Sequence, residues 1–418
     1  MKIGFVSLGC SKNLVDTEMM IGYYKSRNYE IVSDPADAEV IVINTCGFIE
    51  SAKQEAIDTI LEMADYKNHN CEKLIVTGCL VERYLEELKA ELPEVDLFIP
   101  IRDYDKIFDV LDYHNRVIST GNNFAYLRIA DGCSNNCTYC AIPKIRGPLL
   151  SRELDDIVKE AKELETQGYK ELILIAQDTS RYGLDLYGEP RLVELLTELC
   201  KLDFKWIRFL YTYPEMISDE LIDFVKENKK VCRYFDMPIQ HISDPVLKRM
   251  GRKGNSESIR SVIAKIKAAM PDAILRTSLI VGFPGESEDD FNALKEFVRE
   301  TKFNRLGVFR YSMEDGTPAV KLDGHMDEAI KQERYEAIME IQQEISEDFN
   351  NTLINKKLTC IIDEVTDDGE YYVTRSYMDV PDIDGLVFVK RTSEHKVGEF
   401  IDVVVNEAAE YDLIGTEL

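Results

Sequence analysis

The stretch Tyr126-Leu-Arg-Ile-Ala-Asp-Gly-Cys-Ser-Asn-Asn-Cys-Thr-Tyr-Cys140 runs from an apolar β-strand into a loop that carries three cysteines. Five further apolar segments come after it, with amphipathic helical segments between them. Strands and helices that alternate in this way predict a parallel barrel or partial barrel, whose chemistry lies at the carboxyl ends of the strands. The predicted strands are Tyr126–Ala130, Glu171–Ala176, Trp206–Tyr211, Tyr234–Pro238, Ile274–Val281 and Leu306–Tyr311. We therefore expect the cysteine loop at the barrel mouth.

A separate α/β series precedes this barrel. Strands are predicted over Lys2–Leu8, Glu39–Asn44 and Lys73–Thr77, with amphipathic helices after each, which is the pattern of a parallel α/β sheet. A polar stretch over residues 113–123 predicts the first domain boundary. A long helix near residues 327–349 is expected to link the barrel to the C-terminal tail.

The tail switches to five short strands with turns at Asp-Gly pairs, a pattern that predicts a small β-barrel. These strands are Leu358–Ile362, Tyr371–Arg375, Leu386–Val389, Phe400–Val405 and Tyr411–Ile414. The predicted fold class is therefore α/β, with a small C-terminal β-barrel. We expect domains at residues 1–115, 122–350 and 356–418.

Composition narrows the class of function. The 418 residues suffice for two or three domains, and 77 acidic against 50 basic residues give a net charge of −27. Such a chain should be repelled by nucleic acids and anionic membranes. No stretch approaches the ~18 apolar residues that span a bilayer, and the segment ending at Cys10 reads better as a first strand than as a secretory signal. We expect a cytoplasmic protein, and in a reducing cytosol its ten cysteines favour metal-binding or catalytic roles over disulfides.

The barrel-mouth motif, Cys133-Ser-Asn-Asn-Cys137-Thr-Tyr-Cys140, supplies three thiolates on one short loop. Tight sets of soft thiolate ligands suit iron–sulfur clusters. Three ligands leave one iron of a four-iron cluster open to a substrate or cofactor. A zinc site with a missing fourth ligand is the alternative.

Three more cysteines each come directly after a predicted parallel strand of the N-terminal sheet: Cys10, Cys46 and Cys79. Parallel strands end at a common edge, so we expect these thiols to converge and to hold a second cluster. Glycines beside them allow tight turns and close backbone approach. Any one of the three alone would be assigned to core packing. The other four, Cys71, Cys200, Cys232 and Cys360, have no such relation and are assigned as structural thiols.

The Cys-x3-Cys-x2-Cys spacing, with Tyr139 before the last cysteine, resembles the radical S-adenosylmethionine (SAM) superfamily. Two triplets in this order, with a β-barrel tail similar to a TRAM domain, resemble the methylthiotransferases over nearly the whole chain. Within that family the chain is most similar to the branch that modifies an aspartate of small-subunit ribosomal protein S-twelve. The stretches that carry this similarity include Leu-Gly-Cys10-Ser-Lys-Asn-Leu-Val-Asp, Asn-Thr-Cys46-Gly-Phe-Ile, Tyr-Thr-Tyr-Pro-Glu at 211–215, Val-Gly-Phe-Pro-Gly-Glu at 281–286 and Glu-Asp-Gly-Thr-Pro at 314–318.

The resemblance implies two 4Fe–4S clusters and SAM as cofactors. It implies that one SAM methylates a sulfur on the N-terminal cluster, while another yields a radical that removes hydrogen from the aspartate β-carbon. Contacts to SAM are expected from Tyr139, Gln177, Asp178, Gly285 and Glu286. For Asp178 and Glu286, helix capping is the alternative role. His241 is expected either as a site residue or as a structural hydrogen bonder. The basic run Lys144-Ile-Arg-Gly-Pro-Leu-Leu-Ser-Arg152 could bind phosphate or shape the SAM pocket.

The sister branch, which modifies an adenosine in tRNA, is the main alternative. Its tail should be basic, whereas residues 356–418 carry 6 basic and 15 acidic residues, with acidic groups at Asp379, Asp382 and Asp384. This tail either docks on a basic ribosomal protein or is a solvated acidic face, and both options argue against stable tRNA binding. The expected partners are the ribosomal protein or small subunit, an electron donor and a sulfur source. A non-enzymatic iron–sulfur carrier or scaffold, which would not cleave SAM, is the third alternative.

Overall fold

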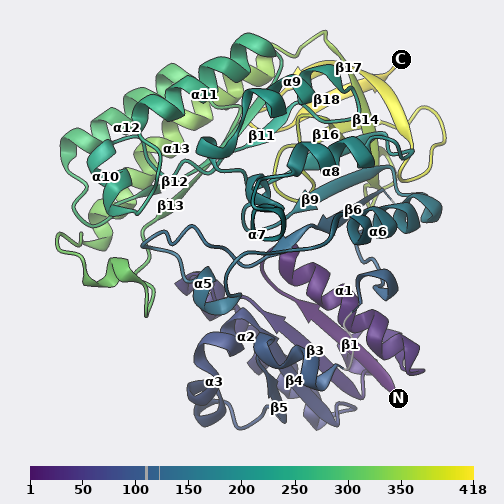
Figure 1. Cartoon of the computed structure of the whole chain (residues 1–418). Coiled ribbons are helices and arrows are strands. Elements are labelled where there is room, and N and C mark those ends of the chain that lie inside the picture. The colour runs from purple at the N-terminus through teal and green to yellow at the C-terminus, as the bar shows by residue number, and fades with distance from the viewer. Residues whose placement is uncertain (109–111, 122) are drawn as a thin grey trace.

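The N-terminal unit is a five-stranded parallel sheet in the order β2-β1-β3-β4-β5, with helices on both faces (Figure 1). The computed structural model describes residues 1–108, 112–121 and 123–418. The elements of the N-terminal unit are β1 (Lys2–Ser7), α1 (Ser11–Ser26), β2 (Glu30–Val32), β3 (Val40–Thr45), α2 (Glu50–Ala64), β4 (Lys73–Gly78), α3 (Cys79–Glu91), β5 (Leu97–Ile99) and α4 (Tyr104–Ile107). The three predicted strands are confirmed, and two short edge strands, β2 and β5, are additional.

The central strand β3 explains why the sheet is covered on both sides. Val40 and Val42 pack into the core shared with α1 and α4, whereas Ile41 and Ile43 pack into the core shared with α2 and α3. All six residues of this strand are buried. A continuous apolar strand of this kind is typical of a parallel sheet that is covered on both faces.

The middle unit contains six parallel strands in two sheets, β6-β9-β10 and β11-β12-β13, which meet at a bridge between Ile207 and Val231. The predicted partial barrel is therefore confirmed. The strands are β6 (Phe124–Arg128), β9 (Glu171–Ile175), β10 (Trp206–Phe209), β11 (Tyr234–Asp236), β12 (Ile274–Val281) and β13 (Arg305–Arg310), with a hairpin of β7 (Ala130–Asp131) and β8 (Leu150–Ser151). The helices are α5 (Ile142–Ile145), α6 (Leu154–Gln167), α7 (Leu184–Tyr187), α8 (Leu192–Leu199), α9 (Asp219–Glu227), α10 (Asp244–Arg249), α11 (Ser256–Ala269), α12 (Glu288–Thr301) and α13 (Glu328–Asn351).

The tail is a closed five-stranded barrel in the order β14-β15-β16-β18-β17, as predicted. Its strands are β14 (Lys357–Val365), β15 (Tyr371–Ser376), β16 (Val387–Lys390), β17 (Phe400–Ala408) and β18 (Leu413–Glu417). Figure 1 shows the middle unit between the N-terminal sheet, in purple, and the tail, in yellow. Ile173 of β9 and Tyr234 of β11 share one apolar core with tail residues such as Cys360 and Val403.

Buried ion pairs attach the tail to the middle unit. Glu171, the first residue of β9, contacts Arg208 at 2.9 Å and Arg375 of the tail at 2.8 Å. Asp379 contacts Arg305 at 2.6 Å, and Asp384 accepts a hydrogen bond from Tyr234 at 2.5 Å. These contacts lie near the amino-terminal ends of the strands, away from the cysteine loop.

This interface corrects the interpretation of the acidic tail. Asp379 and Asp384 belong neither to a docking face nor to a solvated one, because both carboxyls are buried against the middle unit. Asp382, in the same loop, is exposed. Net charge per segment does not distinguish a carboxylate at an internal interface from one in water.

The predicted first boundary is also packed rather than open. Arg116 is buried between the N-terminal and middle units, 2.7 Å from Glu18 of α1 and 2.9 Å from Glu160 of α6. Asn122, the predicted first residue of the middle domain, lies outside the described residues. The helix α13 packs along β13 and α12 and also reaches the tail strand β17. None of the helices in the described residues is long and apolar enough to cross a membrane.

Candidate metal centres

Three cysteines meet at the carboxyl edge of the N-terminal sheet. Cys10 is the N-cap of α1 after β1, Cys46 comes directly after β3, and Cys79 is the first residue of α3. β1 and β3 are the neighbours from which the strand order runs in opposite directions, and open α/β sheets bind ligands at this place. The expected convergence is found: a Cβ atom on Gly9, next to Cys10, would lie 3.0 Å from the sulfur of Cys46, and one on Gly47, next to Cys46, would lie 3.0 Å from the carbonyl carbon of Cys79.

Close backbone approach is needed to bring these loops together. Gly9 has a φ of +89°, and a Cβ atom on it would lie 2.7 Å from the Cβ of Cys46. Gly78 has a φ of +98°, and a Cβ atom there would lie 2.3 Å from the side-chain oxygen of Asn44. Any side chain at either position would both strain the backbone and separate the cysteine loops.

The surroundings of these thiols differ. Burial raises the pKa of Cys79 to about 12, although Arg146 acts in the opposite direction. Desolvation also opposes ionisation of Cys10, yet Lys12 and the backbone amide of Asn13 hold its pKa below the ordinary value. A thiolate ligand set therefore forms here most readily when a metal replaces the protons.

The second triplet lies in a loop at the carboxyl end of the first barrel strand, as expected. The amide of Cys133 donates to the Gly147 carbonyl at 3.0 Å, and the amide of Thr138 donates to the Met250 carbonyl at 2.9 Å. Burial raises the pKa of Cys140 to about 12, with Cys137 and Cys133 adding to the shift. Across the described residues, no three His, Cys, Asp or Glu side chains are arranged to hold a single metal ion. The donor chemistry, two sets of three thiols, is the kind that iron–sulfur clusters use.

Two residues that the sequence reasoning missed lie against the barrel triplet. The hydroxyl of Tyr213 is 2.6 Å from the sulfur of Cys137, and the guanidinium of Arg252 lies 3.8 Å above the Tyr213 ring. Tyr213 belongs to the stretch 211–215 that carried the family resemblance, which could have directed attention to it. Hydrogen bonds to ligand sulfurs tune iron–sulfur clusters, so Tyr213 is placed to act on one held here.

Two of the candidate SAM contacts lie beside the barrel triplet. Gln177 donates to Asp131 at 2.9 Å, and its own side-chain oxygen is buried with no hydrogen-bond partner among the described residues. Asp178 accepts from Asn135 at 2.7 Å and from the amide of Ser180 at 3.1 Å. The capping role considered for Asp178 is thus present, and the unpartnered oxygens of Gln177 and Asn135 leave acceptors for a polar ligand.

The other three candidates lie around α10 and α13. Gly285 has a φ of +81°, and a Cβ on it would lie 2.6 Å from Arg249. Glu286 is buried, with one oxygen 2.5 Å from Arg334 of α13 and the other accepting from the amide of Phe283 at 3.1 Å. The ring of Tyr139 packs edge-on against Phe283, with centroids 6.3 Å apart.

His241 is fully buried and accepts a hydrogen bond from the amide of Ser243 at 2.9 Å. Burial lowers the pKa of His241 to about 3, so the ring is neutral at physiological pH. The Nδ1 atom thus makes a structural hydrogen bond, whereas the Nε2 atom is buried without a hydrogen-bond partner among the described residues.

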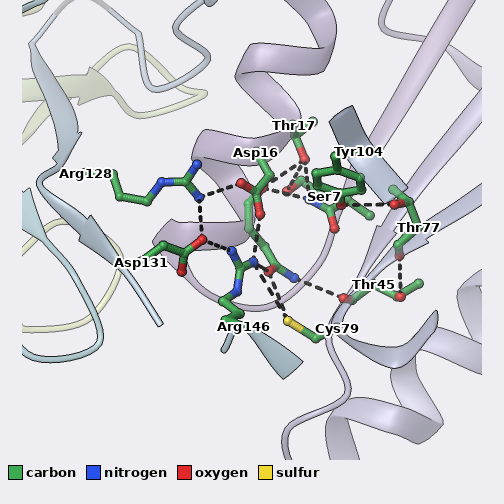
Figure 2. Close-up of polar contacts among 12 residues, drawn as sticks. Ser7, Asp16, Thr17, Thr45, Thr77, Cys79, Tyr104, Arg128, Asp131 and Arg146 are labelled. Carbon is green, nitrogen blue, oxygen red and sulfur yellow. Dashed lines mark hydrogen bonds and ion pairs between the residues drawn. The ribbon is translucent and has the colours of Figure 1, made fainter. Parts of the chain in front are cut away.

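A buried charge network lies beside Cys79 and contains residues of both the N-terminal and the middle unit (Figure 2). Asp16 of α1 accepts from Arg128 at 2.5 Å and from Arg146 at 2.7 Å. Arg146 also contacts Asp131 at 3.1 Å and approaches the sulfur of Cys79 to 3.9 Å. Burial opposes the charge on Asp131, yet Arg146 and Arg128 hold its pKa below the usual value.

A second contact between the units is made by the loop that follows β13. Glu314, in the loop after β13, lies 2.9 Å from Arg83 and 3.2 Å from Lys53. Arg83 also donates to the carbonyl of Gly47, the residue after Cys46, at 2.5 Å. The same loop reaches the barrel triplet, because Ala319 donates to the Thr138 carbonyl at 2.9 Å. The segment 314–319 thus contacts residues beside both cysteine sites, which its sequence did not indicate.

The basic run after the barrel triplet is not a free phosphate site. Lys144 donates to the carbonyl of Gly316, Arg146 joins the buried charge network, and Arg152 contacts Asp156 at 2.6 Å. All three cations are thus engaged within the protein.

Two adjoining cavities open between the units. The inner one, about 270 Å³, has walls from both units, including Phe48, Tyr139 and Arg310. The outer one, about 750 Å³, shares Ile49 and the segment 309–312 with it. The inner cavity is lined by residues that are close in sequence to one cysteine of each triplet, because Phe48 lies two residues after Cys46 and Tyr139 precedes Cys140.

Comparison with known proteins agrees with this architecture. Three family descriptions match the chain: "Uncharacterized protein family UPF0004" over residues 2–100, "Radical SAM superfamily" over residues 127–298 and "TRAM domain" over residues 354–417.

Full-length relatives are found among curated proteins. The ribosomal protein uS12 methylthiotransferase RimO of Alkaliphilus oremlandii is 56% identical over 431 residues, covering 99% of this chain and 98% of that protein. The protein of the same name from Clostridioides difficile is 50% identical over 440 residues, covering 100% and 99%. Among solved structures, the radical SAM methyltransferase TsrM from Kitasatospora setae has a TM-score of 0.57 at 12% identity and 76% coverage of each chain. This last likeness concerns the fold.

Proposed function

The chain belongs to the RimO family of ribosomal protein uS12 methylthiotransferases, and from this premise we propose that it transfers a methylthio group to the β-carbon of an aspartate in small-subunit ribosomal protein S-twelve. The full-length relationship to RimO at 56% identity carries the proposal. As a member of the radical SAM superfamily it uses SAM and iron–sulfur chemistry. Two cysteine triplets support a reaction that needs two metal centres, and Cys79 of one packs in the same apolar cluster as Ala141, which follows Cys140 of the other.

We propose two 4Fe–4S clusters. Cys133, Cys137 and Cys140 would hold one, and a set of three ligands leaves one iron open for SAM. Cys10, Cys46 and Cys79 would hold the other. This second cluster is supported by the convergence of the three cysteines at the edge where β1 and β3 end. The positions beside them must be glycine because the loops approach each other closely.

When bound, the barrel cluster would supply the electron that cleaves one SAM to a hydrogen-abstracting radical, a second SAM would supply the methyl group, and the N-terminal cluster would hold the sulfur that is transferred. The chain's own residues position and shield the reactants. Tyr139 would border SAM from the inner cavity, and Gln177 would offer its unpartnered oxygen to a SAM donor. Asp178, Gly285 and Glu286 would complete the pocket by holding its loops, since their side chains or backbones already contact buried partners.

The inner cavity is the place that we propose for the target aspartate. Arg310, at the end of β13, lines it, and its guanidinium is 47% exposed and 3.9 Å from the nearest paired carboxylate, on Glu328. A guanidinium binds a carboxylate through two parallel hydrogen bonds. Arg310 would therefore hold the γ-carboxylate of the substrate and direct the adjacent β-carbon toward the triplets.

We further propose that residues 1–115, 122–350 and 356–418 act as the sulfur-carrying, radical-generating and substrate-docking domains. The exposed acidic side chains of the tail, such as Glu364, Asp367 and Asp368, would attract a basic ribosomal protein and disfavour stable tRNA binding. The reaction also needs an electron donor and a sulfur source. A cytoplasmic location suits it, because free thiols persist in a reducing compartment.

The proposal is tested with anaerobically reconstituted protein, SAM, a strong reductant and either small ribosomal subunits or tRNA. Mass spectrometry should find one hydrogen of an S-twelve aspartate replaced by a methylthio group, and no change in tRNA. Methylthiolated tRNA with unmodified S-twelve would refute the proposal in favour of the sister branch. Metal binding without release of 5′-deoxyadenosine would indicate a carrier or scaffold.

The cluster assignment has its own test in two triple variants. The protein should hold about eight irons, and alanine at all three positions of either triplet should leave about four. The variant without Cys10, Cys46 and Cys79 should still cleave SAM but form no product. The variant without the barrel triplet should lose cleavage as well. Full iron content in the first variant would contradict an N-terminal cluster.

A further inference from the structure

Arg146 belongs to the loop of the barrel triplet, yet its side chain ends inside the N-terminal unit. It comes directly after the short helix α5, beyond Cys140, and its side chain is 2% exposed. Its Nη2 atom lies 2.7 Å from the side-chain oxygen of Asn13 and 3.9 Å from the sulfur of Cys79. A buried cation from the segment that follows the barrel triplet therefore reaches a cysteine of the N-terminal triplet.

This cation is held firmly in place. Nη2 also donates to Asp16 at 2.7 Å, while Nη1 donates to Asp131 at 3.1 Å. Asp131 is itself fixed by Gln177, which donates to its other oxygen at 2.9 Å. Acceptors from both units thus orient the guanidinium, so its charge has a fixed position relative to Cys79.

The network also contains a natural control. Arg128 shares both carboxylates with Arg146, at 2.5 Å from Asp16 and 3.7 Å from Asp131. Figure 2 shows Arg128 on the far side of Asp16 from Cys79. Its remaining hydrogen bond goes to the hydroxyl of Tyr113 at 2.9 Å. Loss of either arginine removes the same charge from the same two carboxylates, but only Arg146 approaches a cysteine sulfur.

Building on the proposed function, we propose that Arg146 is a positioning residue that raises the reduction potential of the N-terminal iron–sulfur cluster. Reduction adds negative charge to a cluster, and a fixed cation or N–H donor beside a ligand sulfur stabilises that charge. The barrel loop thereby controls the redox state of the N-terminal site directly. A merely structural role would make Arg146 and Arg128 equivalent in this respect.

The test uses the variant with alanine at Cys133, Cys137 and Cys140, in which the N-terminal cluster remains alone. Into this parent we would introduce Arg146→Met, Arg146→Lys and, as the matched control, Arg128→Met. Iron content and the midpoint potential, from an anaerobic redox titration monitored by electron paramagnetic resonance, are measured for each. Arg146→Met should lower the potential, and Arg146→Lys should restore most of it because the charge remains. Arg128→Met should shift it much less.

Equal shifts for Arg146→Met and Arg128→Met, or an unchanged potential in Arg146→Met, would overturn the proposal. If Arg146→Met does not retain iron, Arg146→Gln replaces it, because glutamine keeps a donor without the charge. A parent that binds no iron would instead refute the N-terminal cluster of the proposed function. The two failures are therefore distinguishable.

Discussion

Replacing Asp379 by asparagine should loosen the tail barrel from the middle unit. The carboxyl of Asp379 is 3% exposed, and one oxygen lies 2.6 Å from Arg305 at the start of β13. The other oxygen accepts from the hydroxyl of Ser376 at 3.0 Å. The substitution preserves the volume of the side chain but leaves the Arg305 guanidinium, 10% exposed, without its bonded carboxylate.

The size of the effect depends on this burial. Removing one partner of a buried ion pair costs about 3–5 kcal/mol, because the remaining charge is uncompensated. Asp384 also lies near enough to act on Arg305, so we expect the lower end, about 3 kcal/mol of unfolding free energy. That corresponds to roughly a hundred-fold change in the equilibrium between attached and detached tail.

The protein carries its own reporter for this measurement. Trp206, the single tryptophan, packs edge-on against Phe400 of the tail with centroids 4.8 Å apart. Urea titration monitored by Trp206 fluorescence therefore reports detachment of the tail. The matched control is Asp382→Asn in the same loop, where the exposed side chain should change the free energy by no more than about 0.5 kcal/mol. Equal losses in the two variants would refute the assignment of Asp379 to a buried interface.

Three further perturbations test other parts of the structure. Glu314→Gln should weaken the contact with Arg83 and reduce methylthiolated product by several-fold per 5′-deoxyadenosine released; an unchanged ratio would contradict a role in holding the units together. Burial opposes protonation of His114, but two carboxylates of α6 raise its pKa. The stabilisation of the fold by charged His114 is thus complete below about pH 6.5 and is lost as the pH rises through the raised folded-state pKa. His114→Gln should therefore lower the melting temperature more at about pH 6 than at about pH 9. Equal losses at the two pH values would exclude a contribution from the charged imidazole. Arg310→Gln should raise KM for the ribosomal protein about ten-fold or more, as loss of a charge-assisted pair implies, without changing SAM cleavage in the absence of substrate; an unaltered KM would remove Arg310 from substrate binding.

The amino-acid sequence by itself determined the three units, because strand and helix periodicity is a local property of the chain. The apolar run of β3 and the alternation in the tail predict their elements without knowledge of any partner. The convergence of Cys10, Cys46 and Cys79 was predictable for a related reason: each comes directly after a parallel strand, and such strands end at one edge. The three-residue strands β2 and β5 were missed because edge strands this short are too brief to show a periodic pattern of apolar residues.

Only the tertiary structure decided which charges act together. Asp16 and Arg146 are far apart in the chain, and no spacing rule connects a residue of α1 with one just beyond α5. Charge counting placed Asp379 on a docking or solvated face, and the run 144–152 was expected to bind phosphate or to shape the SAM pocket, whereas packing of one unit on another buries both Asp379 and Arg146. Ion pairs between units depend on the positions of whole domains, so the surroundings of the cysteines became visible only when the sheet edge and the barrel mouth were placed against each other.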